Sequence, residues 1–170
     1  TIKKEADLPA DYLNSNTNGV IWGEGASFFV IGKNKTENSY AKLKNIQISN
    51  KVELNEVKDF IQNFLVQNNL STHDIDAVIL GFSGDAQSDM YYTKAMNLFP
   101  DSAQLYYKHL SGEFNTASGF STFMACHILK EQQIPEIMMI NAEKKESIKN
   151  ILLYNHLAGD DHSLVLLEKA

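Results

Sequence analysis

Apolar side chains between residues 53 and 69 recur with the period of a helix. Side chains three or four residues apart share one helix face. In this stretch they are Val57, Phe60, Ile61, Phe64 and Leu65. The spacing predicts an amphipathic helix, and further helices are predicted over residues 89–99 and 116–132, the second of them mostly apolar.

Short runs of strand-forming residues separate these helices and are bounded by polar or glycine-containing turns. They are residues 20–31, 41–49, 76–81, 104–107, 136–141, 150–154 and 163–168. The last two are predicted to be a closing pair joined by a turn at Gly159-Asp160-Asp161. Strands that alternate with helices predict one α/β layered domain over residues 1–170, with helices packed on a mixed sheet of about five strands.

The composition is that of a folded chain with an acidic balance. Of 170 residues, 44% are hydrophobic and 21% charged, and the net charge is −6. All 15 basic residues are Lys; without the bidentate guanidinium of Arg, nucleic-acid binding is not expected. No apolar run reaches the roughly 20 residues of a membrane helix. The single cysteine, Cys126, excludes an internal disulfide, so a cytoplasmic protein without a membrane anchor is predicted.

The segment from Tyr107 to Gly119 contains the most distinctive pattern. Lys108 is followed after three residues by Gly112, and an Ala-Ser-Gly triplet at residues 117–119 opens the apolar helix. This pattern resembles the catalytic loop of β-ketoacyl synthases, in which a Lys is followed by Gly-His and then by an Ala/Ser-Gly pair. Glu113 stands at the position of that His.

Three other segments carry the same resemblance, in the order of the family. Residues 13–26 keep the glycine of Phe-Asp-x-x-Arg-Asp-Gly and the Gly-Glu-Gly-Ala block, but Thr-Asn replaces Arg-Asp. Residues 70–89 end in a loop that corresponds to Asn-Ala-His-Gly-Thr, with Ser83 at the His position. Residues 155–166 are similar to Phe-Gly-Phe-Gly-Gly-x-Asn-x-Ser-Leu-Val-Leu. The chain therefore resembles the C-terminal half of a β-ketoacyl synthase, which implies a thiolase-like layered half-fold.

The resemblance implies a reaction mechanism, but two residues of that mechanism are replaced in this chain. In the family, a Cys in the N-terminal half accepts an acyl group, and two His, supported by the Lys, donate hydrogen bonds to the thioester oxygen of a malonyl unit. Losing one such donor typically costs about 10²–10³ in rate. Ser83 has a shorter reach than His, and an ionised Glu113 only accepts hydrogen bonds. Leu157 and Gly159 would lie in a loop near the acyl tunnel, and no cofactor or metal is implied.

The residues themselves leave alternatives open. Glu113 lies near a helix start, where a carboxylate is favoured, so it has a structural role, a pairing with Lys108 or a reactive role. Lys108 is either the family's lysine or an ordinary surface lysine, and Ser83 has no nucleophile elbow around it. Cys126 is predicted to be a small core residue. His156 and His162 flank an acidic turn without the spacing of a calcium loop, so a metal site is not expected there.

Gly23-Glu24-Gly25 favours a close-packed crossing over a phosphate cradle, because no helix beginning Gly-Lys-Ser/Thr follows it.

We therefore predict a dimeric, non-condensing, chain-length-factor-like subunit in fatty acid, polyketide or aryl-polyene-type biosynthesis. Its partners would be an acyl carrier protein and an active ketosynthase subunit or its own N-terminal half. The alternatives are a divergent active β-ketoacyl-carrier synthase or acyltransferase with its Cys upstream, and a non-enzymatic interaction module. The absence of Met at position 1 is expected if the chain is a piece of a longer one.

Overall fold

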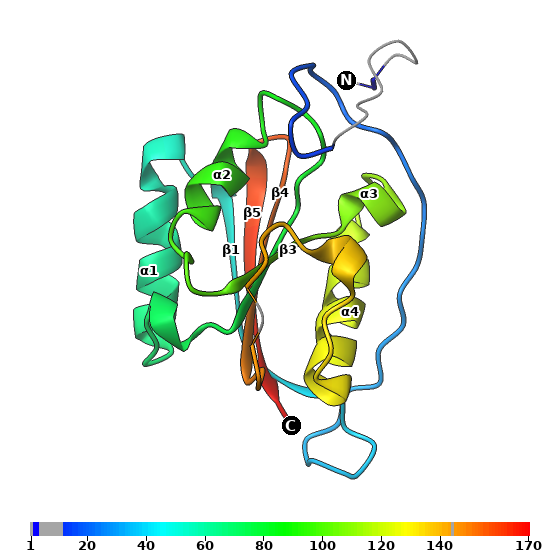
Figure 1. Ribbon diagram of the computed structural model, residues 1–170, viewed down its shortest axis with the longest axis vertical. Helices are drawn as coiled ribbons and strands as arrows, with labels where there is room; N and C mark the ends of the chain where they lie inside the picture. Colours follow the sequence, from blue (N-terminus) through cyan, green and yellow to red (C-terminus); the bar gives the residue numbers. More distant parts are fainter. Residues whose placement is uncertain (1, 4–11, 144) are drawn as a thin grey trace.

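The computed structural model describes residues 2–3, 12–143 and 145–170, and its centre is a five-stranded mixed sheet (Figure 1). The strands are β1 (Ala41–Lys51), β2 (Ala77–Leu80), β3 (Ala103–Tyr106), β4 (Asn150–Leu157) and β5 (Asp160–Lys169). Their order across the sheet is β1-β5-β4-β2-β3. β2 is parallel to both β3 and β4, whereas β5 is antiparallel to β1 and β4. The predicted mixed sheet is confirmed.

Helices cover both faces of this sheet and give the predicted layers (Figure 1). One face carries α1 (Val57–Gln67) and α2 (Met90–Met96), and the other carries α4 (Ala117–Glu131) with the short α3 (Lys108–Ser111) at its end. Three single 3₁₀ turns complete the described elements: η2 (Leu54–Glu56), η3 (Thr72–Asp74) and η4 (Glu136–Met138). Within the described residues, no helix has both the length and the apolarity needed to cross a membrane.

The core follows from the alternation of side chains along β2, which is buried throughout. Val78 and Leu80 pack with α1 and α2, whereas Ala77 and Ile79 pack with α4 on the opposite face. A strand buried on both faces reads as a continuous apolar run, as this one does. Helix α1 buries the face that its spacing predicts.

Residues 20–31 do not form the predicted strand. Their ladder contacts are isolated bridges, from Val20 to Ile2 and from Trp22 to Glu113. The chain then runs as an extended segment past α4 (Figure 1), with Phe28, Val30 and Ile31 exposed. A β-forming sequence becomes a strand only where a neighbour offers backbone groups along its length. None of the described segments does so here.

The prediction of a strand over residues 136–141 is also wrong. Pro135 precedes the 3₁₀ turn η4, and only Met139 bridges to β3, at Leu105. The side chain of Asn141 then replaces backbone pairing, because it accepts from the Gln104 N–H at 3.0 Å and donates to the Ser102 carbonyl at 2.9 Å. An amide side chain that satisfies these groups ends the ladder.

The closing hairpin is longer than predicted, because β4 and β5 extend to Leu157 and Asp160, which pair with each other. The turn lies at Ala158 and Gly159, not at Gly159-Asp160-Asp161, and both turn residues have positive φ. Two consecutive positive φ angles suit the twist of a two-residue hairpin. The shift places the hairpin tip beside the start of α2, where a Cβ on Gly159 would contact the ring of Tyr91.

Candidate functional site

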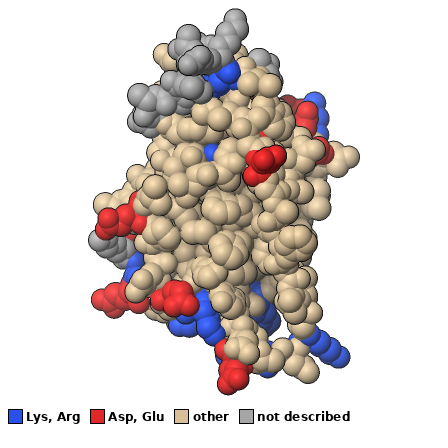
Figure 2. Space-filling model, turned by 90° about the vertical axis from the view of Figure 1, so that its right-hand side faces the viewer, with Lys and Arg blue, Asp and Glu red and all other residues tan. Residues whose placement is uncertain are grey.

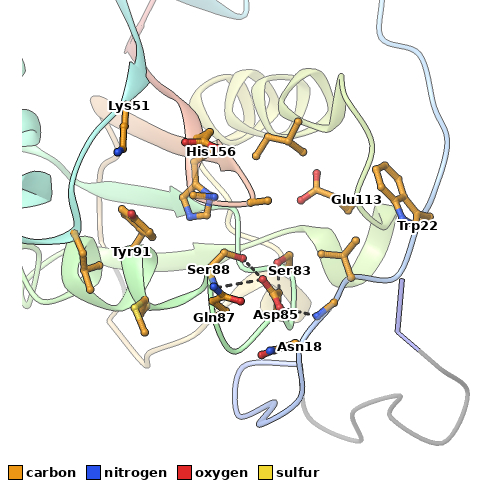
Figure 3. A pocket seen from close by; sticks show the side chains of 18 residues that line it. Asn18, Trp22, Lys51, Ser83, Asp85, Gln87, Ser88, Tyr91, Glu113 and His156 are labelled. Carbon is orange, nitrogen blue, oxygen red and sulfur yellow. Dashed lines mark hydrogen bonds between the residues drawn. The ribbon is translucent and has the colours of Figure 1, made fainter. Parts of the chain in front are cut away.

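A cavity of about 550 Å³ lies where four parts of the chain meet (Figure 3). Its walls come from residues 18–22, from the loop and helix start at residues 83–91, from Glu113, and from the β4–β5 hairpin, with Lys51 and Leu54 at one side. Four of the site residues named from sequence line it: Ser83, Glu113, Leu157 and Gly159. Lys108 lies behind Glu113 and is outside the lining.

Lys108 and Glu113 form a buried ion pair. The Lys108 Nζ lies 2.6 Å from Glu113 Oε2, and the two side chains are 0% and 6% exposed. The surface-lysine alternative is therefore wrong, and the pairing alternative for Glu113 is confirmed. Burial lowers the pKa of Lys108, although the carboxylates of Glu113 and Asp89 oppose the shift. The rings of Tyr92 and Tyr107, each 5.9 Å from Nζ, enclose the remaining side of the ammonium.

The backbone of Glu113 is held where it crosses the backbone of residues 21–23, and two hydrogen bonds form this crossing. The Gly23 N–H donates to the Glu113 carbonyl at 3.0 Å, and the Glu113 N–H donates to the Ile21 carbonyl at 2.8 Å. A Cβ on Gly23 would overlap the carbonyl oxygen of Ser111. Gly112 has φ +72, and a Cβ there would lie 2.6 Å from the Gly23 nitrogen. The predicted close packing of Gly23-Glu24-Gly25 is confirmed, and it positions Glu113.

Ser83 is committed to Asp89, a residue that sequence analysis missed. Its N–H and Oγ–H both donate to Asp89 Oδ1, at 2.9 and 3.0 Å, and the Gly84 N–H donates to Oδ2 at 2.7 Å. Asp89 precedes α2 directly, so the available signal was an acidic residue at a predicted helix start, six residues after Ser83. Because the Ser83 hydroxyl donates its hydrogen bond to Asp89, it offers the cavity only its lone pairs.

Asp89 and Asp85 lie in the same loop, but their pKa values should be shifted in opposite directions. Burial raises the pKa of Asp89 to about 6, against the hydrogen bonds from Ser83 and Gly84 and the charge of Lys108. For Asp85, partial burial is outweighed by hydrogen bonds from Ser88 and Gly19, and the pKa is lowered. Carboxyl ¹³C NMR should therefore show one midpoint near 6 and one below the usual range. A midpoint for Asp89 near its ordinary value of 3.8 would contradict the burial argument.

The sign of the stability effect follows from the raised pKa of Asp89. Between pH 4 and 6 the folded protein holds more of this proton than the unfolded chain, so the Asp89 contribution falls as pH rises through that range. The loss is on the order of 3 kcal/mol. Urea unfolding at pH 4 and pH 7 should show it as a difference between the native protein and Asp89→Asn, whose side chain does not titrate.

His156 lies at the inner wall of the cavity. Its side chain is buried and stacks on Tyr92, with ring centroids 4.2 Å apart. The Gly159 N–H donates to Nδ1 at 3.1 Å, so the neutral ring carries its hydrogen on Nε2. Burial lowers the pKa of His156 to about 2, and the nearby Lys108 and His162 add to the effect. The ring is therefore neutral at physiological pH.

The remaining histidine and cysteine candidates make contacts inside the protein. Among the described residues, no group of three or more His, Cys, Asp or Glu could hold a metal ion. His162 is buried, with Nδ1 2.9 Å from the Tyr154 hydroxyl and Nε2 2.9 Å from the Gly159 carbonyl. Cys126 is half-buried beside the core under α4, and burial raises the pKa of its thiol. It is therefore a poor nucleophile.

Comparisons with known proteins recover the fold from structure but not from sequence. No protein-family model matches the chain, and no curated protein does. The solved structure of a "PfaC Keto synthase-Chain length factor" matches 81% of the chain with a TM-score of 0.63 and 16% identity. The chain has a thiolase-like ketosynthase fold.

Two further ketosynthase structures support this conclusion. A ketosynthase from module 1 of the bacillaene synthase of Bacillus amyloliquefaciens FZB42 matches 77% of the chain, with a TM-score of 0.62 and 16% identity. The ishigamide ketosynthase/chain length factor also matches 77%, with a TM-score of 0.61 and 12% identity. The chain spans only 14%, 30% and 38% of these three proteins, respectively.

Proposed function

We propose that the chain is part of a ketosynthase-like protein that binds acyl groups but does not condense them. One observation carries the proposal: Ser83 and Glu113, the residues at the two His positions of the resemblance, line one cavity and neither offers it a free N–H or O–H. Decarboxylation of a malonyl thioester builds negative charge on the thioester oxygen, and preorganised donors aimed at that oxygen are the main means of catalysis.

The charges around the cavity reinforce this argument. Glu113 presents a carboxylate, which would repel a developing enolate, and its charge is compensated by Lys108 on the side away from the cavity. The same pairing engages the Lys108 ammonium, which would otherwise be the strongest donor near the site. The chain thus has a cavity at the position where the resemblance places the reaction, but Ser83 and Glu113, which line it, disfavour decarboxylation.

A protein partner is part of the proposal. One matching structure is described as a type II polyketide acyl-carrier protein in complex with its ketosynthase, and others as ketosynthase/chain length factor proteins. The face of this chain that carries α4 and the extended segment is largely uncharged at its middle (Figure 2). Phe28, Val30 and Ile31 are exposed in that segment. Exposed apolar runs of this kind favour contact with another protein surface, here an active ketosynthase subunit or an N-terminal half of the same protein, in the cytoplasm.

The test is decarboxylation of malonyl-acyl carrier protein by the complete protein, with an active ketosynthase assayed alongside. We expect a rate at least about 10²-fold below that of the active enzyme, because both donors are replaced. Decarboxylation at the rate of the active enzyme would overturn the proposal. Failure to bind any acyl carrier protein or ketosynthase would instead indicate an interaction module that kept only the fold.

A divergent active acyltransferase is the second candidate. It is favoured by the cavity, which remains open beside a buried Lys108–Glu113 pair and a buried neutral His156. A reactive Cys in the upstream part of the protein would support this candidate, whereas another residue at that place would support the non-condensing subunit.

A further inference from the structure

Residues 24–38 form an exposed segment whose backbone is unpaired over most of its length. Every residue in this range is exposed. Among the described residues, no hydrogen bond reaches the backbone of residues 24–35, and the first pairing after them is that of Thr36 with Ser39. Ordering a chain costs conformational entropy, which only buried surface or paired backbone groups can offset. This segment has neither within the described residues, so its order calls for a neighbour.

The middle of the segment is a continuous apolar run. Residues 28–31 are Phe-Phe-Val-Ile, and they are 95%, 44%, 105% and 83% exposed, respectively. The face of the molecule that carries them with α4 is largely uncharged at its middle (Figure 2). Contiguous exposed apolar surface of this kind marks an interaction site.

The apolar side chains lie on both sides of the extended segment. A Cβ on Gly119 would lie 3.2 Å from the side chain of Ser27, so one side of the segment rests on α4 (Figure 1). Successive side chains of an extended chain alternate in direction. Phe29 therefore shares the side of Ser27 and is the least exposed of the run, whereas Phe28 and Val30 face away from α4. A run that is apolar on both sides is typical of a strand inside a sheet that further layers cover.

The unpaired backbone decides which kind of surface can cover this run. A lipid surface would bury the side chains but leave the N–H and C=O groups without partners. A helix of a partner would do the same, because its own backbone groups are paired within it. A β-strand covers side chains and pairs backbone groups at the same time. The neighbour is therefore a strand.

A permanent neighbour in the same protein is favoured over a reversible one. An apolar, unpaired strand that is left exposed invites aggregation. A second copy of the segment would pair with one of its edges only, because the backbone groups of a strand alternate between both edges. The chain spans only 14%, 30% and 38% of the three ketosynthases compared above, so a protein of their length has further chain to supply strands on both edges.

We propose that residues 27–32 form an inner strand of a β-sheet in the N-terminal half of the same protein. Helix α4 then lies between that sheet and the sheet described above, and the N-terminal half supplies a layer over Phe28 and Val30. The identity of the partner rests on the proposed function, whereas the strand pairing rests on the unpaired backbone and the alternating side chains of the segment.

Hydrogen exchange of the complete protein tests the strand. The amides of residues 28–31 should exchange at least about 10³-fold more slowly than in a free peptide, because a paired inner strand opens only with the fold around it. Those of residues 33–35 should exchange near the free-peptide rate. Val30→Asp places a charge under the covering layer and should remove the protection. Lys35→Asp is the matched control and should keep it. Free-peptide exchange of residues 28–31 in the native complete protein would overturn the inference, whether or not Val30→Asp folds.

Photochemical cross-linking of the complete protein identifies the neighbour. In a mixture of unlabelled and ¹⁵N-labelled protein, Phe28→p-benzoylphenylalanine should cross-link to a peptide from upstream of Thr1, and both peptides should carry the same label. Mixed labels, which indicate a second copy, or a cross-link that forms only to an added active ketosynthase would overturn the assignment. Malonyl decarboxylation at the rate of an active enzyme, together with protected amides and the upstream cross-link, would overturn the proposed function and leave the strand pairing standing.

Discussion

Lys108→Met should lower the free energy of unfolding by about 3–5 kcal/mol, because it leaves the buried carboxylate of Glu113 without its partner. Glu113 Oε2 lies 2.6 Å from Nζ, and neither side chain has appreciable contact with water. The enclosing rings of Tyr92 and Tyr107 offer no replacement cation. Urea unfolding followed by the fluorescence of Trp22, the single Trp of the chain, measures the loss.

Two variants separate the loss of the ion pair from the loss of any lysine. Lys42 pairs with Glu168 at 3.4 Å on the surface, and Lys42→Met should change stability by no more than about 1 kcal/mol. The double variant Lys108→Met/Glu113→Leu removes both charges and should regain most of the stability that Lys108→Met loses. A single variant as stable as the native protein, or a double variant less stable than the single one, would contradict the buried pair.

The parts of the fold that were predicted correctly from sequence are those in which the spacing of apolar residues directly indicates which side chains are buried. The spacing from Val57 to Leu65 predicted α1, and the apolar run within residues 76–81 predicted the strand that the structure shows as β2. The strand predictions for residues 20–31 and 136–141 were wrong because a strand forms only where a neighbouring segment pairs with its backbone. Their composition favours strands, but the first has no partner along its length and the second is cut short by Pro135 and the Asn141 side chain.

The candidate site was predicted in part for a related reason. The family resemblance placed Ser83 and Glu113 at the two His positions and Leu157 and Gly159 near the acyl tunnel, and these four residues line one cavity. The burial of Lys108 and the capture of Ser83 by Asp89 depend on side-chain packing, which spacing does not encode. The same holds for His156, whose ring is fixed by stacking on Tyr92 and by the Gly159 N–H.

Gly23→Ala should destabilise the protein by about 3 kcal/mol and move Glu113 away from Lys108. The added methyl group would overlap the Ser111 carbonyl, a backbone atom that cannot rotate away, at the point where Gly23 and Glu113 exchange a hydrogen bond at 3.0 Å. Overpacking of a rigid contact costs about 1–3 kcal/mol, and here the crossing also positions one half of the ion pair. Relief of the overlap must therefore displace residues 111–113.

Gly32 is the matched control, since a Cβ there meets nothing closer than the Asn34 carbonyl at 3.8 Å. Gly32→Ala should be neutral or slightly stabilising, because alanine restricts the unfolded chain more than glycine does. If displacement of Glu113 is the cause, Gly23→Ala and Lys108→Met should not be additive, because the first already weakens the pair that the second removes. Unfolding of Gly23→Ala, Lys108→Met and their double variant measures this coupling. Strict additivity, or a Gly23→Ala protein as stable as Gly32→Ala, would show that the crossing does not hold Glu113 in place.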